Sequence, residues 1–243
     1  MFENMLDNIQ AGNEGELARA ISLVINEVPG YEALLGSSNQ PSTPVIGITG
    51  PPGAGKSTLT SKLISELIMG DNRVAVLCVD PSSPFSKGAI LGDRIRMSEW
   101  YSHPSVYIRS LATRGSSGGL PPHAGNLIKL LKWAPFDYIL IETVGVGQNE
   151  VDIAALADCT VLVLVPEAGD EIQLMKAGLM ETGDIYVVNK SDRPGADQFA
   201  NDLKSMLKAA PRKNKKVVLK TSAINREGIA ELASAIRNRV EAD

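Results

Sequence analysis

The sequence predicts an α/β fold in which a mostly parallel sheet carries helices on both faces, preceded by an N-terminal helical extension. From residue 45 onward, short apolar runs alternate with segments whose apolar residues recur at helical spacing, a pattern typical of strand–helix–strand crossover units. A glycine-rich motif separates the first run from the first helical segment, and polar residues directly follow several runs. Because parallel sheets bind ligands at the carboxyl ends of their strands, these polar residues mark the candidate site.

Each element is predicted from its periodicity. Apolar runs predict strands at residues 44–49, 74–79, 105–109, 138–141, 161–165, 185–188 and 217–219. Helical spacing predicts helices at residues 59–68, 123–133, 173–180, 199–207 and 229–240. Residues 1–39 are expected to form the helical extension, with one helix over about 13–27, and residues 40–243 to form the main domain.

The composition is that of an ordinary globular protein, with 44% hydrophobic and 21% charged residues among 243. The net charge of -4, from 24 basic and 28 acidic side chains, argues against bulk attraction to nucleic acid or to a membrane surface. Cys78 and Cys159 both lie in apolar runs, which predicts buried free thiols and a reducing compartment. His103 and His123 are predicted to be ordinary side chains. We expect a cytoplasmic protein, because no secretory signal and no apolar stretch of about 18 residues is visible.

The first motif is the stretch Gly50-Pro51-Pro52-Gly53-Ala54-Gly55-Lys56-Ser57-Thr58. It matches G-x-x-x-x-G-K-S between a predicted strand and a predicted helix, and therefore predicts the phosphate-binding loop (P-loop) of a nucleoside triphosphatase. Its glycines let backbone N–H groups surround a phosphate chain at the positive end of the helix dipole. Lys56 would reach the β- and γ-phosphates and Ser57 would hold Mg²⁺, whereas the alternative is a glycine-rich turn with a chance lysine.

A second motif, Asn189-Lys190-Ser191-Asp192, directly follows the strand predicted at 185–188. In GTP-binding proteins N-K-x-D reads the base, because the Asp carboxylate accepts hydrogen bonds from the ring N–H and the exocyclic amine of guanine. Adenine lacks this pair of donors, so an unpaired carboxylate would oppose its binding. Thr221-Ser222-Ala223 follows the last predicted strand and resembles the second guanine-contacting loop of GTPases. The alternative, a surface turn at 189–192, is weakened by the phosphate loop upstream.

Candidate metal ligands lie just after two predicted strands. Glu142 directly follows the strand predicted at 138–141 and can belong to the Mg²⁺ shell together with Ser57. Asp80 and Asp93 add two carboxylates, which suit a hard cation that prefers oxygen ligands. The sequence therefore predicts a magnesium-assisted reaction on the phosphates.

Residues that assist hydrolysis are expected around the same loops. The Gly145 N–H can approach the γ-phosphate, and Lys56 neutralises phosphate charge. Gln148 either positions the attacking water or does no chemistry, and the sequence leaves both open. Arg96 either neutralises phosphate charge or forms an ordinary surface ion pair.

These stretches together resemble the MeaB/ArgK-type GTPases, the G-protein chaperones of adenosylcobalamin-dependent acyl-CoA mutases such as methylmalonyl-CoA mutase. The resemblance covers nearly the whole chain. Its matching stretches are ITGPPGAGKSTL (48–59), VDPSSP (79–84), LGDRIRM (91–97), RSLATRG (109–115), GGL (118–120), ETVGVGQNEVDIA (142–154), AGDEIQ (168–173) and VNKSD (188–192), with AGNEGELARAISLVINEVPG (11–30) before them.

The resemblance implies a protein that binds GTP and GDP with Mg²⁺, hydrolyses GTP slowly, gates cofactor loading of a B12-dependent mutase, and protects or rescues that mutase. Residues 80–97 and 142–150 would be nucleotide-sensing switches, and residues 168–173 would signal to the mutase. The implied site residues are Gly50 to Thr58 for the phosphates; Asn189, Lys190, Asp192, Ser222, Ala223 and Ile224 for guanine; and Ser57, Asp80, Asp93 and Glu142 for Mg²⁺, directly or through water.

Three features depart from the family pattern. Ser86-Lys87-Gly88 stands where Thr-Gly-Gly is usual, and Glu167 stands where a glycine is common. The chain stops at Asp243, where family members usually continue into a helical arm used for dimerisation, so a homodimer is left open.

Three rival functions remain open on the sequence alone. A small-molecule kinase would use Asp80 or Asp93 to accept a hydroxyl proton, but the guanine motif opposes it. A GTPase that delivers nickel would usually carry Cys/His clusters, which two scattered cysteines and two scattered histidines do not supply. A nucleotide-gated binding module would hydrolyse little GTP. We expect neither nucleic acid nor a membrane as a partner.

Overall fold

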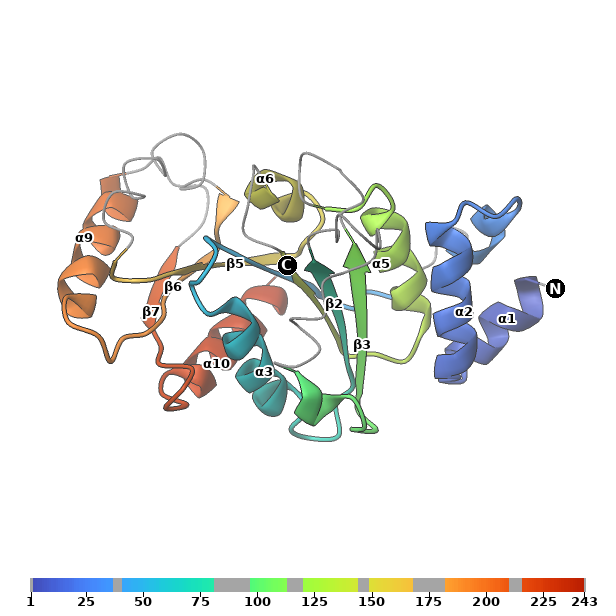
Figure 1. Cartoon of the computed structure of the whole chain (residues 1–243), viewed down its shortest axis with the longest axis horizontal. Coiled ribbons are helices and arrows are strands. Elements are labelled where there is room, and N and C mark those ends of the chain that lie inside the picture. The colour runs from blue at the N-terminus through green and yellow to red at the C-terminus, as the bar shows by residue number, and fades with distance from the viewer. Residues whose placement is uncertain are drawn as a thin grey trace, which may run out of the picture.

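The fold is a seven-stranded parallel sheet with helices on both faces, as the sequence predicts (Figure 1). The computed structural model describes residues 2–36, 41–80, 97–112, 120–143, 149–167, 182–209 and 216–242. The strand order is β3-β2-β4-β1-β5-β6-β7. The strands are β1 (Val45–Thr49), β2 (Val74–Asp80), β3 (Val106–Ala112), β4 (Tyr138–Glu142), β5 (Cys159–Leu164), β6 (Ile185–Val188) and β7 (Val217–Lys220).

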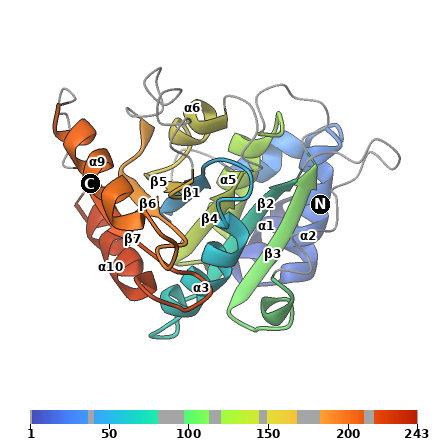
Figure 2. The ribbon, with the colours of Figure 1, turned by 60° about the vertical axis from the view of Figure 1, so that its left-hand side comes forward.

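Within the described residues, two α-helices cover one face of the sheet and three cover the other. The apolar sides of α3 (Lys56–Leu67) and α10 (Ile229–Val240) share one buried cluster with alternate residues of the strands. On the opposite face lie α5 (Ala124–Trp133), α6 (Asn149–Ala154) and α9 (Ala196–Ala209). Figure 2 shows the strands running side by side between these two layers. Because both faces are covered, the central strands are mostly apolar, with Thr49 and Glu142 at the carboxyl ends of β1 and β4.

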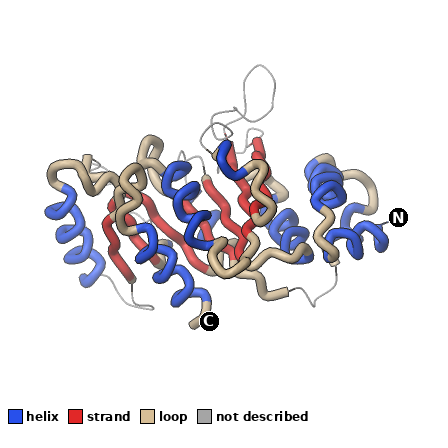
Figure 3. The backbone as a smooth tube through the Cα atoms, turned by 90° about the horizontal axis from the view of Figure 1, so that it is seen from below, coloured by secondary structure: helices blue, strands red, loops and turns tan. Residues whose placement is uncertain are grey.

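A group of N-terminal helices packs beyond the sheet against α5 (Figure 3). It comprises α1 (Phe2–Gln10), α2 (Glu14–Ile25) and the 3-10 helix η1 (Tyr31–Leu35). The helix expected at 13–27 is present as α2, whose N-cap Asn13 accepts a hydrogen bond from Glu16 N. The sequence interpretation missed α1 and η1, and elsewhere in the chain α6 and the 3-10 helix η2 (Ser98–Trp100). The signal for α1 was available, because its apolar residues Phe2, Met5, Leu6 and Ile9 recur at helical spacing.

Some expectations differ from the structure or lie outside the described residues. The third strand is longer than the apolar run at 105–109, because β2 pairs with β3 from Val74↔Val106 to Asp80↔Ala112. Sheet pairing thus extends β3 through polar residues that break its hydrophobic pattern. The helix expected at 173–180 lies outside the described residues. Cys78 and Cys159 are buried free thiols, as predicted.

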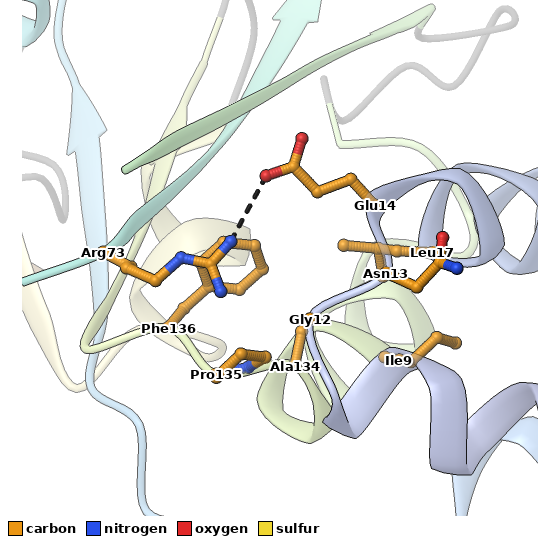
Figure 4. A pocket seen from close by; sticks show the side chains of 9 residues that line it. All are labelled: Ile9, Gly12, Asn13, Glu14, Leu17, Arg73, Ala134, Pro135 and Phe136. Carbon is orange, nitrogen blue, oxygen red and sulfur yellow. Dashed lines mark hydrogen bonds and ion pairs between the residues drawn. The ribbon is translucent and has the colours of Figure 1, made fainter. Parts of the chain in front are cut away.

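The N-terminal helices meet the sheet at a small crevice at the amino ends of the strands (Figure 4). There the Arg73 guanidinium stacks 5.4 Å from the centre of the Phe136 ring and pairs with Glu14 at 3.3 Å. Arg73 precedes β2 and Phe136 precedes β4, so this crevice lies at the edge of the sheet opposite to the glycine-rich loop. Its lining residues are Ile9, Gly12, Asn13, Glu14, Leu17, Arg73, Ala134, Pro135 and Phe136.

The topology places the glycine-rich loop between the ends of two neighbouring strands. β1 pairs with β4 on one side, where Ile48 is opposite Glu142, and with β5 on the other, where Thr49 is opposite Leu162. The loop after β1 therefore emerges at the carboxyl edge, beside the acid that ends β4. Among the helices within the described ranges, none is long and apolar enough to cross a membrane.

Candidate nucleotide-binding site

The loop between β1 and α3 has the backbone conformation that its glycines permit. Gly50, Gly53 and Gly55 have φ angles of 137°, 77° and 87°, which L-residues rarely adopt. A Cβ atom at Gly50 would stand 2.0 Å from the carbonyl oxygen of Val163 on β5. Gly55 is the N-cap of α3, so the positive end of the helix dipole lies directly behind the loop.

The Lys56 side chain folds back onto this loop. Its Nζ donates to the carbonyl oxygens of Gly50 at 2.8 Å and Pro51 at 3.0 Å, and the residue is only 6% exposed. The ammonium group is therefore held at the concave side of the loop, where it can meet a phosphate chain. This position agrees with the role expected for the lysine of a phosphate loop.

Ser57 and Glu142 meet at the base of the loop. The Ser57 hydroxyl donates to Glu142 Oε1 at 2.6 Å, and both residues are buried. Beside them, the Thr143 hydroxyl donates to Thr49 Oγ1 at 2.9 Å, which ties the ends of β4 and β1 together. A hydroxyl and a carboxylate at one point offer the hard oxygen ligands that Mg²⁺ prefers, so the residues present fit this cation.

The Asn189-Lys190 pair is bonded directly to the glycine-rich loop. Asn189 follows β6, and its Nδ2 donates to the Ala54 carbonyl oxygen at 2.8 Å. The next side chain, Lys190, donates from Nζ to the Gly53 carbonyl oxygen at 2.7 Å. Consecutive residues of one motif thus hold consecutive carbonyl groups of the other.

Asn189 also joins the loop that follows β7. Its Oδ1 accepts from the Thr221 hydroxyl at 3.0 Å and from Ala223 N at 3.2 Å, and the residue is 2% exposed. With the bond to Ala54, one amide side chain connects three loops at the carboxyl edge of the sheet. A buried amide with satisfied partners on two other loops fixes the relative positions of all three.

Asp192 is held by Ser222, and this contact sets its charge. The Ser222 hydroxyl donates to Asp192 Oδ1 at 2.6 Å. This hydrogen bond is the largest of the effects that hold the pKa of Asp192 below its ordinary value. The carboxylate is therefore ionised at neutral pH and can accept hydrogen bonds. Ser222 and Ala223 are buried, whereas Ile224 is 80% exposed beside them.

An ion pair lies next to Asp192. Arg193 pairs with Glu167, and both side chains are about half exposed. The Glu167 contact raises the pKa of Arg193, and the Arg193 hydrogen bond lowers the pKa of Glu167. The sequence interpretation noted Glu167 only as a departure from the family pattern and did not connect it with Arg193.

The structure brings most of the predicted site residues to one edge of the sheet. The residues 50–58, Glu142, Asn189, Lys190, Asp192 and 222–224 come from four separate loops. Asp80 ends β2, the strand next to β4. Asp93, Arg96, Gly145 and Gln148 lie outside the described residues.

Two threonines of the site were missed by sequence reasoning. Thr49 and Thr143 are buried and bonded to each other at the foot of the loop. Each directly flanks a predicted site residue, Gly50 or Glu142. A polar residue at the end of an otherwise apolar strand was the available signal.

A phosphate loop bonded to an N-K-x-D motif at the carboxyl edge of a parallel sheet defines a GTPase of the P-loop class. This class assignment agrees with the chain's relatives. The chain belongs to the methylmalonyl-CoA mutase-associated GTPase MeaB family, whose sequence model matches residues 17–242.

Two curated relatives and one solved structure illustrate the likeness. A putative GTPase of Pyrococcus horikoshii is 44% identical over 244 residues, which cover 97% of this chain and 77% of the relative. The GTPase ArgK of Escherichia coli is 37% identical over 240 residues, covering 94% of this chain and 72% of ArgK. The crystal structure of a LAO/AO transport system kinase superposes with a TM-score of 0.77 at 28% identity, covering 99% of this chain and 75% of that chain.

A likeness to a nickel protein is limited to the fold. The structure of HypB from Helicobacter pylori in complex with nickel superposes with a TM-score of 0.58 at 15% identity, covering 91% of this chain and 95% of HypB. Within the part of the chain that the structure describes, no group of three or more His, Cys, Asp or Glu side chains gathers as a metal site.

Proposed function

We propose that this GTPase is a chaperone of an adenosylcobalamin-dependent acyl-CoA mutase, which gates cofactor loading and protects or rescues the mutase. The observation that carries the nucleotide-dependent part of the proposal is the set of bonds from Asn189 and Lys190 to the glycine-rich loop. Through them the groups that would hold base and phosphates form one network, as a nucleotide-dependent switch requires. The family is named for its association with methylmalonyl-CoA mutase, which supports the choice of client.

The nucleotide would be held at three points of this network. Residues 50–58 would surround the phosphates, with Lys56 opposite the β- and γ-phosphates. Asp192 would accept hydrogen bonds from guanine, while Asn189 and Lys190 keep the phosphate loop in place. The segment 222–224 would complete the base pocket.

Ser57 and Glu142 would hold Mg²⁺, with Asp80 and Asp93 as further ligands, directly or through water. The buried Ser57–Glu142 contact at 2.6 Å supports this assignment, since both groups are hard oxygen donors. The cation would neutralise charge that develops between the β- and γ-phosphates.

Hydrolysis would depend on positioning and charge stabilisation rather than on a covalent nucleophile. Lys56 and Arg96 would stabilise phosphate charge, and the Gly145 N–H would approach the γ-phosphate. If Gln148 orients the attacking water, Gln148→Ala should abolish the basal rate of GTP hydrolysis while GTP still binds. An unchanged rate would show that Gln148 has no catalytic role. Slow hydrolysis would then depend only on how the other residues position the phosphates.

The chaperone proposal is tested with the full chain and a purified adenosylcobalamin-dependent acyl-CoA mutase from the same host. We expect the mutase to bind more tightly in the presence of a non-hydrolysable GTP analogue than with GDP, and its cofactor loading to depend on GTP. Lys56→Ala is the control, because it removes the phosphate-loop cation and should abolish this nucleotide dependence. Equal mutase affinity with GTP analogue, GDP and no nucleotide would contradict the proposal.

A kinase function is the alternative, because one of the similar solved structures is named as a LAO/AO transport system kinase. A kinase differs from a GTPase in needing an acceptor for the phosphoryl group. Release of inorganic phosphate from GTP by the purified chain alone supports the GTPase, whereas release that requires an added small-molecule acceptor supports the kinase.

A further inference from the structure

Two serine hydroxyls on one face of α3 donate to carboxylates on two different elements. Ser57 and Ser61 are four residues apart and therefore lie on the same face of the helix. The Ser57 hydroxyl donates to Glu142 Oε1 at 2.6 Å, and the Ser61 hydroxyl donates to Glu99 Oε1 at 2.6 Å. The face that carries the proposed Mg²⁺ ligand is thus anchored again one turn further along.

The second anchor is the short 3-10 helix η2 (Ser98–Trp100). The indole N–H of Trp100 lies 2.9 Å from the Ser61 hydroxyl oxygen and 3.1 Å from the Ser61 carbonyl oxygen. The Ser61 hydroxyl therefore donates to a carboxylate and accepts from an indole, so its orientation is set from two sides. We refer to Ser61, Glu99 and Trp100 as the α3–η2 clamp.

Charge strengthens the clamp, although the side chain of its carboxylate residue, Glu99, is 46% exposed. Ser61 and Trp100 are buried, and Lys62 Nζ lies 3.0 Å from Glu99 Oε1. The hydrogen bond from Ser61, followed by that from Lys62, lowers the pKa of Glu99. Glu99 is thus a carboxylate at neutral pH, and charge-assisted hydrogen bonds of this kind are stronger than neutral ones.

The clamp connects to the metal site on its strand side as well. Met97, which directly precedes η2, is fully buried, and its sulfur lies 3.7 Å from Cys78 Sγ. Cys78 on β2 is the register partner of Glu142 on β4. The segment 97–100 therefore contacts α3, the helix that carries Ser57, and β2, the strand that pairs with β4 at Glu142. Because protein interiors are close-packed, a displacement of η2 would be transmitted to both of these residues.

We infer that the α3–η2 clamp positions Ser57 against Glu142, which makes Ser61 and Trp100 positioning residues for the metal of the GTPase reaction. The inference rests on the Mg²⁺ role proposed above for Ser57 and Glu142. The clamp acts through α3 and does not touch the nucleotide. The glycine-rich loop is held separately by Asn189 and Lys190, so loss of the clamp weakens the metal site more than the grip on the nucleotide.

Ser61→Ala and Trp100→Phe test the inference by removing one partner each. The measurement is the dissociation rate of a fluorescent GDP analogue at increasing Mg²⁺, starting from the complex formed in EDTA. We expect the half-saturating Mg²⁺ concentration to rise about 2- to 10-fold in each variant, the range that one lost hydrogen bond implies. Affinity for the analogue in EDTA should change less than about twofold.

Ser65→Ala is the matched control, because the Ser65 hydroxyl donates within α3 itself, to the Lys62 carbonyl oxygen at 2.6 Å. It should leave the half-saturating Mg²⁺ unchanged. A spectroscopic readout is possible in a Trp133→Phe background, where Trp100 is the single tryptophan because the chain has 2. There, Mg²⁺ should change the Trp100 fluorescence of the GDP complex, and Ser61→Ala should reduce that change.

Two results would overturn the inference while leaving the proposed metal site intact. One is an unchanged half-saturating Mg²⁺ in both clamp variants. The other is an equal loss of affinity with and without Mg²⁺, which would indicate a purely structural role. If GDP dissociation from the parent protein did not depend on Mg²⁺, the proposed metal role of Ser57 and Glu142 would be rejected instead. Trp100→Phe keeps an aromatic ring in place, so it stays informative should Ser61→Ala reduce the folded fraction.

Discussion

The carboxyl edge of the sheet, where the proposed nucleotide site lies, and the N-terminal helices are held in place by different interactions. We refer to this edge as the nucleotide edge. At the nucleotide edge, buried polar groups bond loops that are distant in sequence, as Asn189 does for the loops after β1 and β7. The N-terminal helices bury apolar side chains against α5, among them Leu17, Ile21 and Val24. Their polar contacts lie at the margin, such as the Glu14–Arg73 pair. Hydrogen bonds are directional and apolar burial is not, so substitutions in the two regions should have separable effects.

The largest effect on GTP binding is expected from Gly50→Ala at the nucleotide edge. The new Cβ would stand 2.0 Å from a backbone carbonyl oxygen of β5, at a φ of 137°, so the loop must move. We expect the free energy of unfolding to fall by about 3 kcal/mol and GTP binding to be lost. Isothermal titration and chemical denaturation check the two effects.

Gly53→Ala is the control for that prediction. Gly53 also has a positive φ of 77°, but a Cβ there would meet nothing within 4 Å. Only the backbone penalty of about 1–2 kcal/mol should remain. If Gly53→Ala were as damaging as Gly50→Ala, positive φ rather than the contact with β5 would explain the requirement for glycine.

Ile21→Ala should break the N-terminal region instead. Ile21 is fully buried between α2 and its neighbours, so truncation should lower the free energy of unfolding by about 2–5 kcal/mol. GTP affinity of the folded protein should stay within about twofold of the parent, because the nucleotide loops keep their own bonds. Arg19→Ala on the same helix, whose side chain is 59% exposed, is the control. A loss of GTP affinity parallel to the loss of stability would show that the two regions are coupled.

The same contrast explains what the sequence could predict. The strands and the helices α3, α5, α9 and α10 follow from periodicity, whereas α6 and η2 did not. The motifs at 50–58 and 189–192 fall where each was expected. The bonds between the motifs did not follow, because they depend on how the ends of β1, β6 and β7 meet in space. The Ser61–Trp100 contact is beyond sequence reasoning for the same reason, since it joins residues 39 apart across two elements.

Asp192→Asn sharpens the assignment of the base site. The amide presents a donor where guanine also presents donors, so GTP affinity should fall about 100-fold and xanthosine triphosphate should bind instead. Competition binding with GTP, ATP and xanthosine triphosphate measures both changes. Because the Ser222 bond lowers the pKa of Asp192, the parent's carboxylate stays charged in mild acid. Its GTP affinity should decline only as the pH falls through that lowered pKa. Equal affinity of the parent for ATP and GTP would overturn the guanine assignment.

The smallest effect is expected at the Glu167–Arg193 pair on the rim of the base site. Arg193 directly follows Asp192 in the chain, and its charge is among the lesser causes, after the Ser222 bond, that lower the pKa of Asp192. We therefore expect an Arg193 guanidinium without its own partner to compete with guanine for that carboxylate. Glu167 engages Arg193 instead. Glu167→Ala should therefore weaken GTP binding by less than about fivefold, the scale of an exposed ion pair.

The double variant Glu167→Ala/Arg193→Ala decides whether this small effect passes through Asp192. Once the guanidinium is gone it cannot compete for the Asp192 carboxylate, so the double variant should bind GTP more tightly than Glu167→Ala and as tightly as Arg193→Ala. A merely structural ion pair would give the opposite pattern, because either single substitution would already remove it and the double variant would be no better than Glu167→Ala. Recovery would assign to Glu167, a departure from the family pattern, the task of keeping the base-reading carboxylate available to guanine.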